Sequence, residues 1–294
     1  MNHAEFLRTL PDDARLSLTE TSDRAGLAHL AGHVGLLALT GTLIALRVPL
    51  WPLLLPIHGT LLVFLFTLEH ECTHRTPFRS PRLSDLTGRL CGVLLLLPFE
   101  WFRAFHLAHH RWTNIPGKDP ELATPKPETP GAWLRHVSGL PFWAAGARLT
   151  IRLALGRERA PYLPPRALPR MRREARAILA LYALAALSLL ATPLILWVWI
   201  VPALLGQPLL RLYLLAEHGD CPKVADMFLN TRTTFTNRCV RFLAWNMPYH
   251  AEHHVLPAVP FHRLPDLHQR MRTHLKVTAE GYAAFTRDYL ARRI

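Results

Sequence analysis

The stretch LLLPIHGTLLVFLFTLEHECTH (residues 53–74) decides the fold. Residues 53–68 carry no charged side chain, and one further turn brings them close to the roughly 20 residues that a helix needs to cross a bilayer. The run ends in H-E-C-T-H, in which His70 and His74 are four residues apart and share one face of a helix. The stretch therefore predicts a membrane-spanning helix whose end carries two potential metal ligands.

Three further apolar stretches also predict membrane spans, and short linkers join the four in pairs. We place the spans at about 27–46, 53–70, 177–191 and 194–216. A short linker between two spans predicts a tight transmembrane hairpin. We therefore expect an all-α membrane protein with four transmembrane helices arranged as two hairpins.

Two weaker apolar runs, 92–102 and 133–155, contain charged residues and are typical of interfacial helices that lie on the membrane surface. With them we expect a cytoplasmic helical cap that carries the remaining histidine clusters. Residues 27–294 would then form a single membrane domain, preceded by a cytoplasmic N-terminal segment, residues 1–26.

The charge distribution predicts the orientation. The chain has 34 Lys and Arg against 21 Asp and Glu, a net charge of +13, yet only 19% of its residues are charged. This apolar composition excludes a disordered chain and argues against a nucleic-acid-binding protein. If residues 1–26, 71–176 and 217–294 share one side of the membrane, that side holds 32 of the 34 basic residues. The positive-inside rule then predicts an inner-membrane protein with both termini and all histidine clusters in the cytoplasm.

Seventeen histidines is a high number for 294 residues, and eight of them form three clusters. The clusters are H-E-C-T-H, H-L-A-H-H and H-A-E-H-H, with histidines at positions 70 and 74, at 106, 109 and 110, and at 250, 253 and 254. Spacings of three and four residues direct these imidazoles to one side of a helix, as chelation requires. His218 at the end of the fourth span is a ninth candidate, because an ionisable residue there is a functional candidate by default.

The ligand type alone does not select the metal, because neutral imidazole suits zinc, copper, iron and nickel. Eight or nine histidines exceed what one tetrahedral zinc ion uses, so two metal ions are indicated. H-E-C-T-H also matches H-E-x-x-H, the zinc motif of metalloproteases, in which the Glu acts as general base. That hypothesis leaves both H-x-x-H-H clusters unused.

Taken together, the clusters make the chain similar to the integral-membrane fatty acid desaturase and hydroxylase superfamily, whose hallmark is three histidine boxes in this order. The stretch WNMPYHAEHHVLPAVPFHRLP (residues 245–265) particularly resembles bacterial fatty acid desaturases. The resemblance implies a non-haem di-iron site held by His70, His74, His106, His109, His110, His218, His250, His253 and His254.

In one position the chain departs from animal members of the superfamily, which have an Asn where this chain has Leu214. That difference leaves the coordination of the second iron open. Glu217, Asn246 or a water is a candidate additional ligand or supporting group.

The resemblance further implies an oxidoreductase that uses O2 as co-substrate and introduces a double bond into a fatty acyl or related lipid chain. Alternatives are a membrane hydroxylase or ketolase of a lipid, alkane or carotenoid, and, more remotely, the zinc metalloprotease. Electrons would come from a separate ferredoxin-like acidic carrier, which the basic cytoplasmic face could attract. Candidate residues lining a substrate slot are Trp101, Phe102, Phe105, Trp112 and Trp245.

Overall fold

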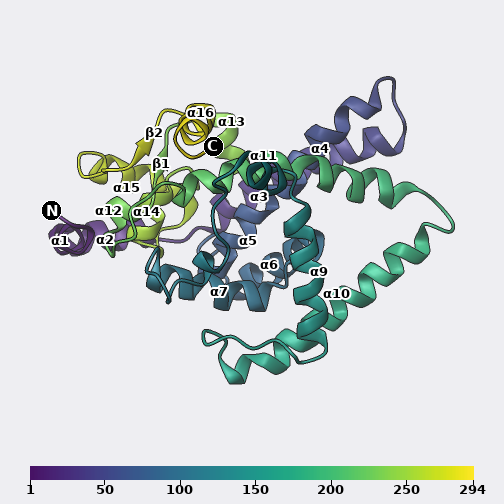
Figure 1. Ribbon diagram of the computed structural model, residues 1–294, viewed down its shortest axis with the longest axis horizontal. Coiled ribbons are helices and arrows are strands. Elements are labelled where there is room, and N and C mark those ends of the chain that lie inside the picture. The colour runs from purple at the N-terminus through teal and green to yellow at the C-terminus, as the bar shows by residue number, and fades with distance from the viewer.

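The computed structural model describes residues 1–294 and is almost entirely helical (Figure 1). The first eleven helices are α1 His3–Thr9, α2 Asp12–Thr19, α3 Asp23–Ala45, α4 Leu54–Val63, α5 Leu65–His74, α6 Pro81–Leu95, α7 Phe99–Trp112, α8 Pro130–Val137, α9 Leu140–Ala154, α10 Leu168–Ser188 and α11 Val201–His218. Short 3-10 turns cover Trp51–Leu53, Pro120–Ala123, Pro165–Ala167 and Phe261–Arg263, and a π-helical turn at Leu196–Ile200 leads into α11.

The C-terminal part forms a cap of short elements. They are α12 Met227–Asn230, β1 Thr233–Thr234, α13 Arg238–Leu243, α14 His250–Val255, α15 Leu264–Met271, β2 Thr278–Ala279 and α16 Tyr282–Arg293. The two strands pair in parallel, with Thr233 opposite Thr278. This pairing ties the chain that precedes α14 to the chain that follows α15.

Three helical segments are long and apolar enough to cross a membrane, namely Asp12–Ala45, Trp51–His74 and Leu196–His218. The bent pair α6 and α7, whose axes meet at 102°, adds a fourth if it counts as one broken span. The protein is thus helical with three or four candidate spans. The predicted third span falls in the second half of α10, which is not among these segments because arginines crowd its first half. Four spans in two hairpins therefore stay a prediction.

The chain reverses at two tips, which lie on the right of Figure 1, away from α14 and α15 on the left. One tip joins α3 to α4 and the other joins α10 to α11. The tips contact each other, because the indole rings of Trp51 and Trp197 meet edge to face with centroids 5.3 Å apart. Arg47 is the only charged residue in the two tips, residues 46–53 and 189–195. The clustered histidines lie away from the tips, for example at the far ends of α5 and α11.

Both runs predicted to be interfacial helices are interrupted. Residues 92–102 straddle the bend between α6 and α7, where Leu96 takes a left-handed conformation (φ 53°) and Pro98 precedes the new helix. Residues 133–155 divide into α8 and α9 at Gly139, whose φ of +71° ends the first helix. A residue at positive φ cannot continue a right-handed helix, so each run becomes two elements.

The second and fourth predicted spans, α4 and α11, cross at very close range. A Cβ added to Gly59 would lie 1.9 Å from the carbonyl oxygen of Pro202, and one added to Gly206 would lie 2.2 Å from the carbonyl oxygen of Gly59. Small residues let helices approach in this way within a membrane. The contact fixes α5, which continues α4, relative to the end of α11.

A shared core joins the N-terminal helices to the cap. Phe6 of α1 and Leu18 of α2 are buried together with Val63 of α4, Leu210 of α11 and Leu264 of α15. The rings of Phe6 and Phe228 also meet edge to face, with centroids 5.9 Å apart. Residues 1–26 are therefore packed against the elements that carry histidines.

The crossing of α4 and α11 predicts the effect of a single methyl group. Gly206→Ala should lower the thermal unfolding temperature of the detergent-solubilised protein, because overpacking against backbone costs about 1–3 kcal/mol. Gly35→Ala is the matched control, since no atom lies within 4 Å of a Cβ added there. Equal unfolding temperatures for the two variants would contradict the close crossing.

Candidate metal centre

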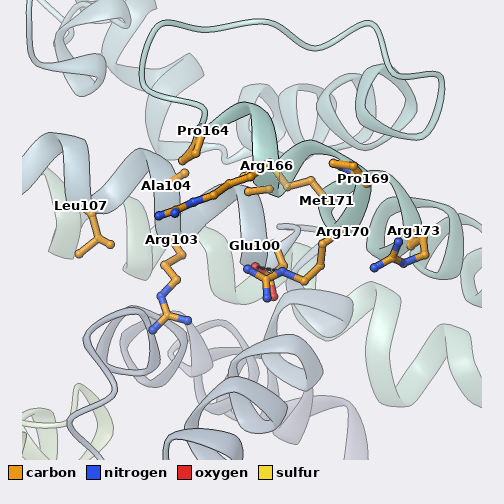
Figure 2. Close-up of a pocket in the computed structure, with 11 residues that line it drawn as sticks. Glu100, Arg103, Ala104, Leu107, Pro164, Arg166, Pro169, Arg170, Met171 and Arg173 are labelled. Carbon is orange, nitrogen blue, oxygen red and sulfur yellow. Dashed lines mark ion pairs between the residues drawn. The ribbon is translucent and has the colours of Figure 1, made fainter.

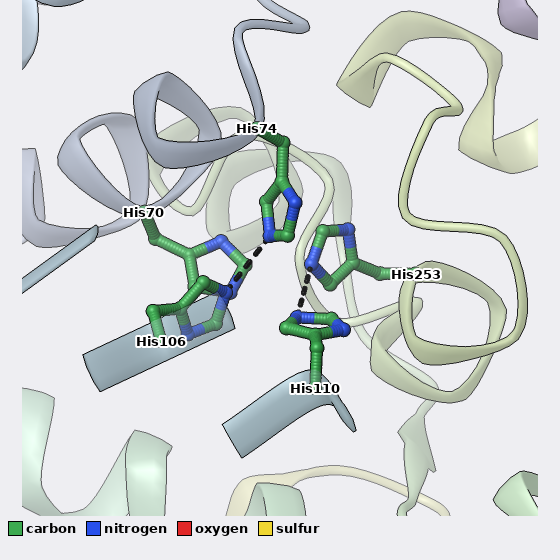
Figure 3. A group of neighbouring side chains, drawn as sticks. All are labelled: His70, His74, His106, His110 and His253. Atoms are coloured by element: carbon green, nitrogen blue, oxygen red, sulfur yellow. Dashed lines mark hydrogen bonds between the residues drawn. The ribbon is translucent and has the colours of Figure 1, made fainter. Parts of the chain in front are cut away.

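Five histidines from three helices form the first group, shown in Figure 3. They are His70 and His74 of α5, His106 and His110 of α7, and His253 of α14. One ring nitrogen of each lies within 4.8 Å of those of all the others. The closest pairs join Nε2 of His74 to Nε2 of His106 at 2.9 Å, and Nε2 of His110 to Nε2 of His253 at 3.1 Å.

A second group contains His109 of α7, His218 at the end of α11 and His254 of α14. Nε2 of His109 lies 3.2 Å from Nε2 of His218. His250 belongs beside this group, because its Nε2 lies 3.1 Å from Nε2 of both His218 and His254. The nine predicted histidines thus divide five to four.

The two groups are neighbours because two pairs of adjacent residues divide between them. His109 and His110 follow each other on α7, and His253 and His254 on α14, so in each pair the side chains diverge by about 100° around the helix axis. The rings of His110 and His254 stack across the boundary with centroids 4.1 Å apart. Helices α7 and α14 therefore each contribute histidines to both groups.

In three of the four histidines of the second group, the ring nitrogen that faces away from the centre has a polar partner. Nδ1 of His109 lies 3.0 Å from Oδ1 of Asp119, and Nδ1 of His218 lies 3.1 Å from the carbonyl oxygen of Asn230. Nδ1 of His254 lies 3.1 Å from Oγ1 of Thr113. A carbonyl or carboxylate partner places the proton on Nδ1 and leaves the Nε2 lone pair of His109 and His218 free for a metal.

Asp119 is itself held rigidly by the loop between α7 and α8. Its Oδ2 accepts a hydrogen bond from the backbone N–H of Asn114 (2.7 Å), and its Oδ1 accepts one from the N–H of Glu121 (2.9 Å). Burial alone would raise the pKa of Glu121. The ammonium of Lys126, 2.5 Å from its Oε1, and the nearby His109 instead hold this pKa below its usual range. Sequence reasoning missed Asp119, because no motif or spacing connects it to His109.

The donor atoms fit a pair of metal ions. Both ring nitrogens of His70 are buried without a hydrogen-bond partner, and the Nε2 atoms of the other eight histidines lie against Nε2 atoms of their neighbours. Burial and the neighbouring histidines also hold the pKa of His253 and His254 well below the usual range, so both rings are neutral near pH 7. Neutral imidazoles with converging Nε2 atoms are the ligands that zinc and first-row redox metals such as iron accept.

Of the two extra candidates, Glu217 lies near the second group and Asn246 does not join either group. Oε1 of Glu217 is 3.4 Å from Nδ1 of His250, on the side of the ring that faces away from the other histidines. The amide of Asn246 donates to the carbonyl oxygen of Phe261 at 3.0 Å and makes no hydrogen bond to any of the nine histidines.

The candidate slot residues separate into two sets. Trp101 and Phe105 stack with ring centroids 5.1 Å apart, and the ring of Phe102 lies 5.6 Å from that of His106. Trp245 is instead fully buried, and its indole N–H faces Nδ1 of His33 at 3.2 Å. Trp112 is 38% exposed beneath the ammonium of Lys118. Of the five candidates, Phe102 is the one whose ring contacts one of the nine histidines, and Trp101 and Phe105 lie on the same helix.

The metalloprotease hypothesis gains no support from Glu71, the residue that would act as its general base. Oε2 of Glu71 accepts hydrogen bonds from Oγ1 of Thr76 (2.9 Å) and from the N–H of Phe261 (3.1 Å). Its Oε1 lies 3.8 Å from Nδ1 of His253, and the whole side chain is buried. Glu71 is therefore held by Thr76 and Phe261 in a buried position behind His253, where it is not placed to activate a water.

Comparison with known proteins agrees with this geometry. The sequence profile of the family described as "Fatty acid desaturase" matches residues 46–286. The chain belongs to the fatty acid desaturase family.

Individual relatives match over shorter segments. An sn-1 oleoyl-lipid 12-desaturase of Picosynechococcus sp. is 34% identical over 118 residues, which is 37% of this chain and 34% of that protein. A chloroplastic temperature-sensitive sn-2 acyl-lipid omega-3 desaturase (ferredoxin) of Arabidopsis thaliana is 37% identical over 62 residues, 21% of this chain and 14% of that protein. An endoplasmic reticulum omega-6 fatty acid desaturase of Glycine max is 28% identical over 106 residues, 36% of this chain and 27% of that protein. The matches therefore span about a third or less of these relatives.

The Asp119–His109 contact predicts a specific loss of metal. Asp119→Ala should lower the metal affinity of the second group about 10–100-fold, because the group that orients His109 is removed. Iron per purified protein should fall toward half of the wild-type value, measured by mass spectrometry of the metal. Glu128→Gln, which removes an exposed carboxylate of the same loop, should keep the wild-type value. Full iron content in Asp119→Ala would contradict the positioning role.

Proposed function

We propose that this protein is an O2-dependent, non-haem di-iron oxidoreductase that introduces a double bond into a fatty acyl or related lipid chain. The observation that carries the proposal is the pair of adjacent buried histidine groups in a chain of the fatty acid desaturase family. His70, His74, His106, His110 and His253 would hold one iron ion, and His109, His218, His250 and His254 the other. The iron pair, when bound, supplies the O2 activation needed to remove hydrogen from an unactivated methylene.

The role of the protein is to orient these ligands and to keep water away from them. Asp119, Asn230 and Thr113 orient ligands of the second group, and Glu71 lies behind His253 in the first. Thr113 and Asp119 lie in the segment that follows α7, Glu71 lies on α5, and Asn230 lies on α12 of the cap. Seven of the nine histidines are buried, and His74 and His110 are partly exposed, so the reacting carbon would meet the centre in a largely dry environment.

The substrate chain would approach along the aromatic face of α7. Trp101 and Phe105 form this face together with Tyr162, whose ring lies 5.8 Å from that of Phe105. Phe102 connects it to His106. A wall of flat apolar rings beside the metal ligands suits a methylene chain, which offers no polar group for recognition.

An external electron donor follows from the overall reaction. Removal of two hydrogens from a chain with reduction of O2 to two waters takes up two electrons and two protons. The four cysteines of the chain are free thiols and form no cluster that could hold an iron–sulfur centre. We propose a ferredoxin-like acidic donor that the basic cytoplasmic face attracts; one relative carries ferredoxin in its name.

The charge distribution supports a location in the inner membrane, with the termini and both histidine groups on the cytoplasmic side. The proposal includes a single membrane domain over residues 27–294. Residues 1–26 would form a cytoplasmic segment, and they are packed against the cap through Phe6 and Leu18.

Lipid analysis of a heterologous host tests the proposed reaction. Cells that express the wild-type protein should accumulate acyl chains lighter by two hydrogens than those of cells carrying an empty vector. Chains heavier by one oxygen would instead show a hydroxylase. His253→Ala should abolish the new product, because it removes a ligand that belongs to the five-histidine group.

His262→Ala is the matched control for that experiment. His262 lies eight to twelve residues from the histidines of the third cluster, forms no side-chain hydrogen bond and belongs to neither group. Its variant should therefore make the wild-type product. Unchanged lipids in cells that contain iron-loaded wild-type protein and a working electron donor would contradict acyl desaturation.

A further inference from the structure

A cavity of about 430 Å³ lies outside the histidine groups, between α7 and the start of α10 (Figure 2). Four arginines and a single acidic residue, Glu100, line it. The arginines are Arg103, Arg166, Arg170 and Arg173. The lining therefore carries a positive formal charge that the cavity itself does not neutralise.

Two of these arginines are already committed to carboxylates. Nε of Arg170 pairs with Oε2 of Glu100 at 2.9 Å, and the two side-chain tips lie together in Figure 2. Nη1 of Arg103 pairs with Oδ1 of Asp85 at 2.8 Å and points away from the cavity. These ion pairs fix the side chains of Arg103 and Arg170. The other two arginines of the lining, Arg166 and Arg173, remain to be considered.

Arg166 and Arg173 are exposed and form no ion pair and no side-chain hydrogen bond. Figure 2 shows Arg166 extended toward Ala104 across the cavity. A guanidinium offers five N–H donors in a planar fork that matches phosphate and carboxylate oxygens. Two uncommitted guanidinium groups beside a cavity of this size are therefore suited to an anion.

The position of the cavity indicates which anion reaches it. Beyond the arginines, α10 presents leucines that are 47–61% exposed in the structure, namely Leu181, Leu184 and Leu187. Such a face suits contact with lipid chains. At 1.5 Å per residue, Arg173 lies only about 12 Å along the helix from Leu181. If this leucine face lies in the hydrocarbon, as the predicted span at 177–191 requires, the cavity lies at the depth of the lipid head groups.

The cavity also has an apolar component that a soluble anion would not need. Ala104 and Leu107 of α7 and Ala167 and Met171 of the α10 segment belong to its lining. Leu107 is 45% exposed. A molecule with a phosphate next to aliphatic carbon would meet both kinds of wall, as the glycerol phosphate part of a phospholipid does.

We propose that this cavity binds the phosphate of a phospholipid head group among its arginines, with Arg166 and Arg173 toward its two ends and Arg170 held between them by Glu100 (Figure 2). The site is distinct from both histidine groups and requires no reaction there, so it goes beyond the proposed desaturase activity. The proposed ligand is the phosphate group of a lipid. Inorganic phosphate carries the same chemical group, and the experiment below distinguishes the two ligands.

The test is native mass spectrometry of the purified full-length protein in a neutral detergent. Binding of dioleoylphosphatidylglycerol is compared with that of dioleoylglycerol, which has the same acyl chains and no phosphate. The wild-type protein should bind the phospholipid at least about tenfold more tightly, and this preference should shrink as salt rises. Arg166→Gln/Arg173→Gln should lose roughly tenfold in phospholipid affinity, since it removes two charged donors.

Arg148→Gln/Arg157→Gln is the matched control, because it removes the same charge from exposed arginines outside the cavity. This variant should bind the phospholipid like the wild type. Equal losses in both double variants would overturn the site and leave only general attraction of anions. Displacement of the phospholipid by an equal concentration of inorganic phosphate would overturn the assignment to a lipid. Wild-type elution on size exclusion would show that the variants are folded.

Discussion

The constraint on which the structure depends is that nine imidazoles, from four helices far apart in the sequence, must meet at their Nε2 atoms. Pairs of Nε2 atoms lie only 2.9–3.2 Å apart, with no carboxylate between them. Buried polar atoms in such an arrangement are expensive unless each finds a partner. Two metal ions would satisfy them together, which is why the division into five and four histidines is informative.

The rest of the fold supplies the rigidity that this arrangement requires. The close crossing of α4 and α11 at Gly59 and Gly206 fixes the ends of two helices, one leading to His70 and the other ending at His218. The shared core of the N-terminal helices and the cap holds α14 against them. Outward-facing ring nitrogens are then fixed by Asp119, Asn230 and Thr113, which come from the segments between and beside these helices.

Much of this site could be predicted from the sequence, because the patterns that indicate it involve residues close together in the chain. Spacings of three and four residues in the clusters place imidazoles on one helical face, and the apolar runs around 27–46, 53–70 and 194–216 correspond to the three long apolar helical segments. Asp119 and Asn230 could not be found in this way. Each acts through a contact with a residue that is ten or more positions away, and that contact exists only once the loops have folded. The span near 177–191 is ambiguous for a related reason, since α10 combines a basic half and an apolar half in one continuous helix.

The central claim is that the two histidine groups hold a pair of iron ions. The most direct test is metal analysis of the purified protein combined with X-ray absorption at the iron edge. The account predicts about two iron ions per chain, each with a first shell dominated by imidazole nitrogen. One zinc ion per chain, or iron held as haem, would contradict it.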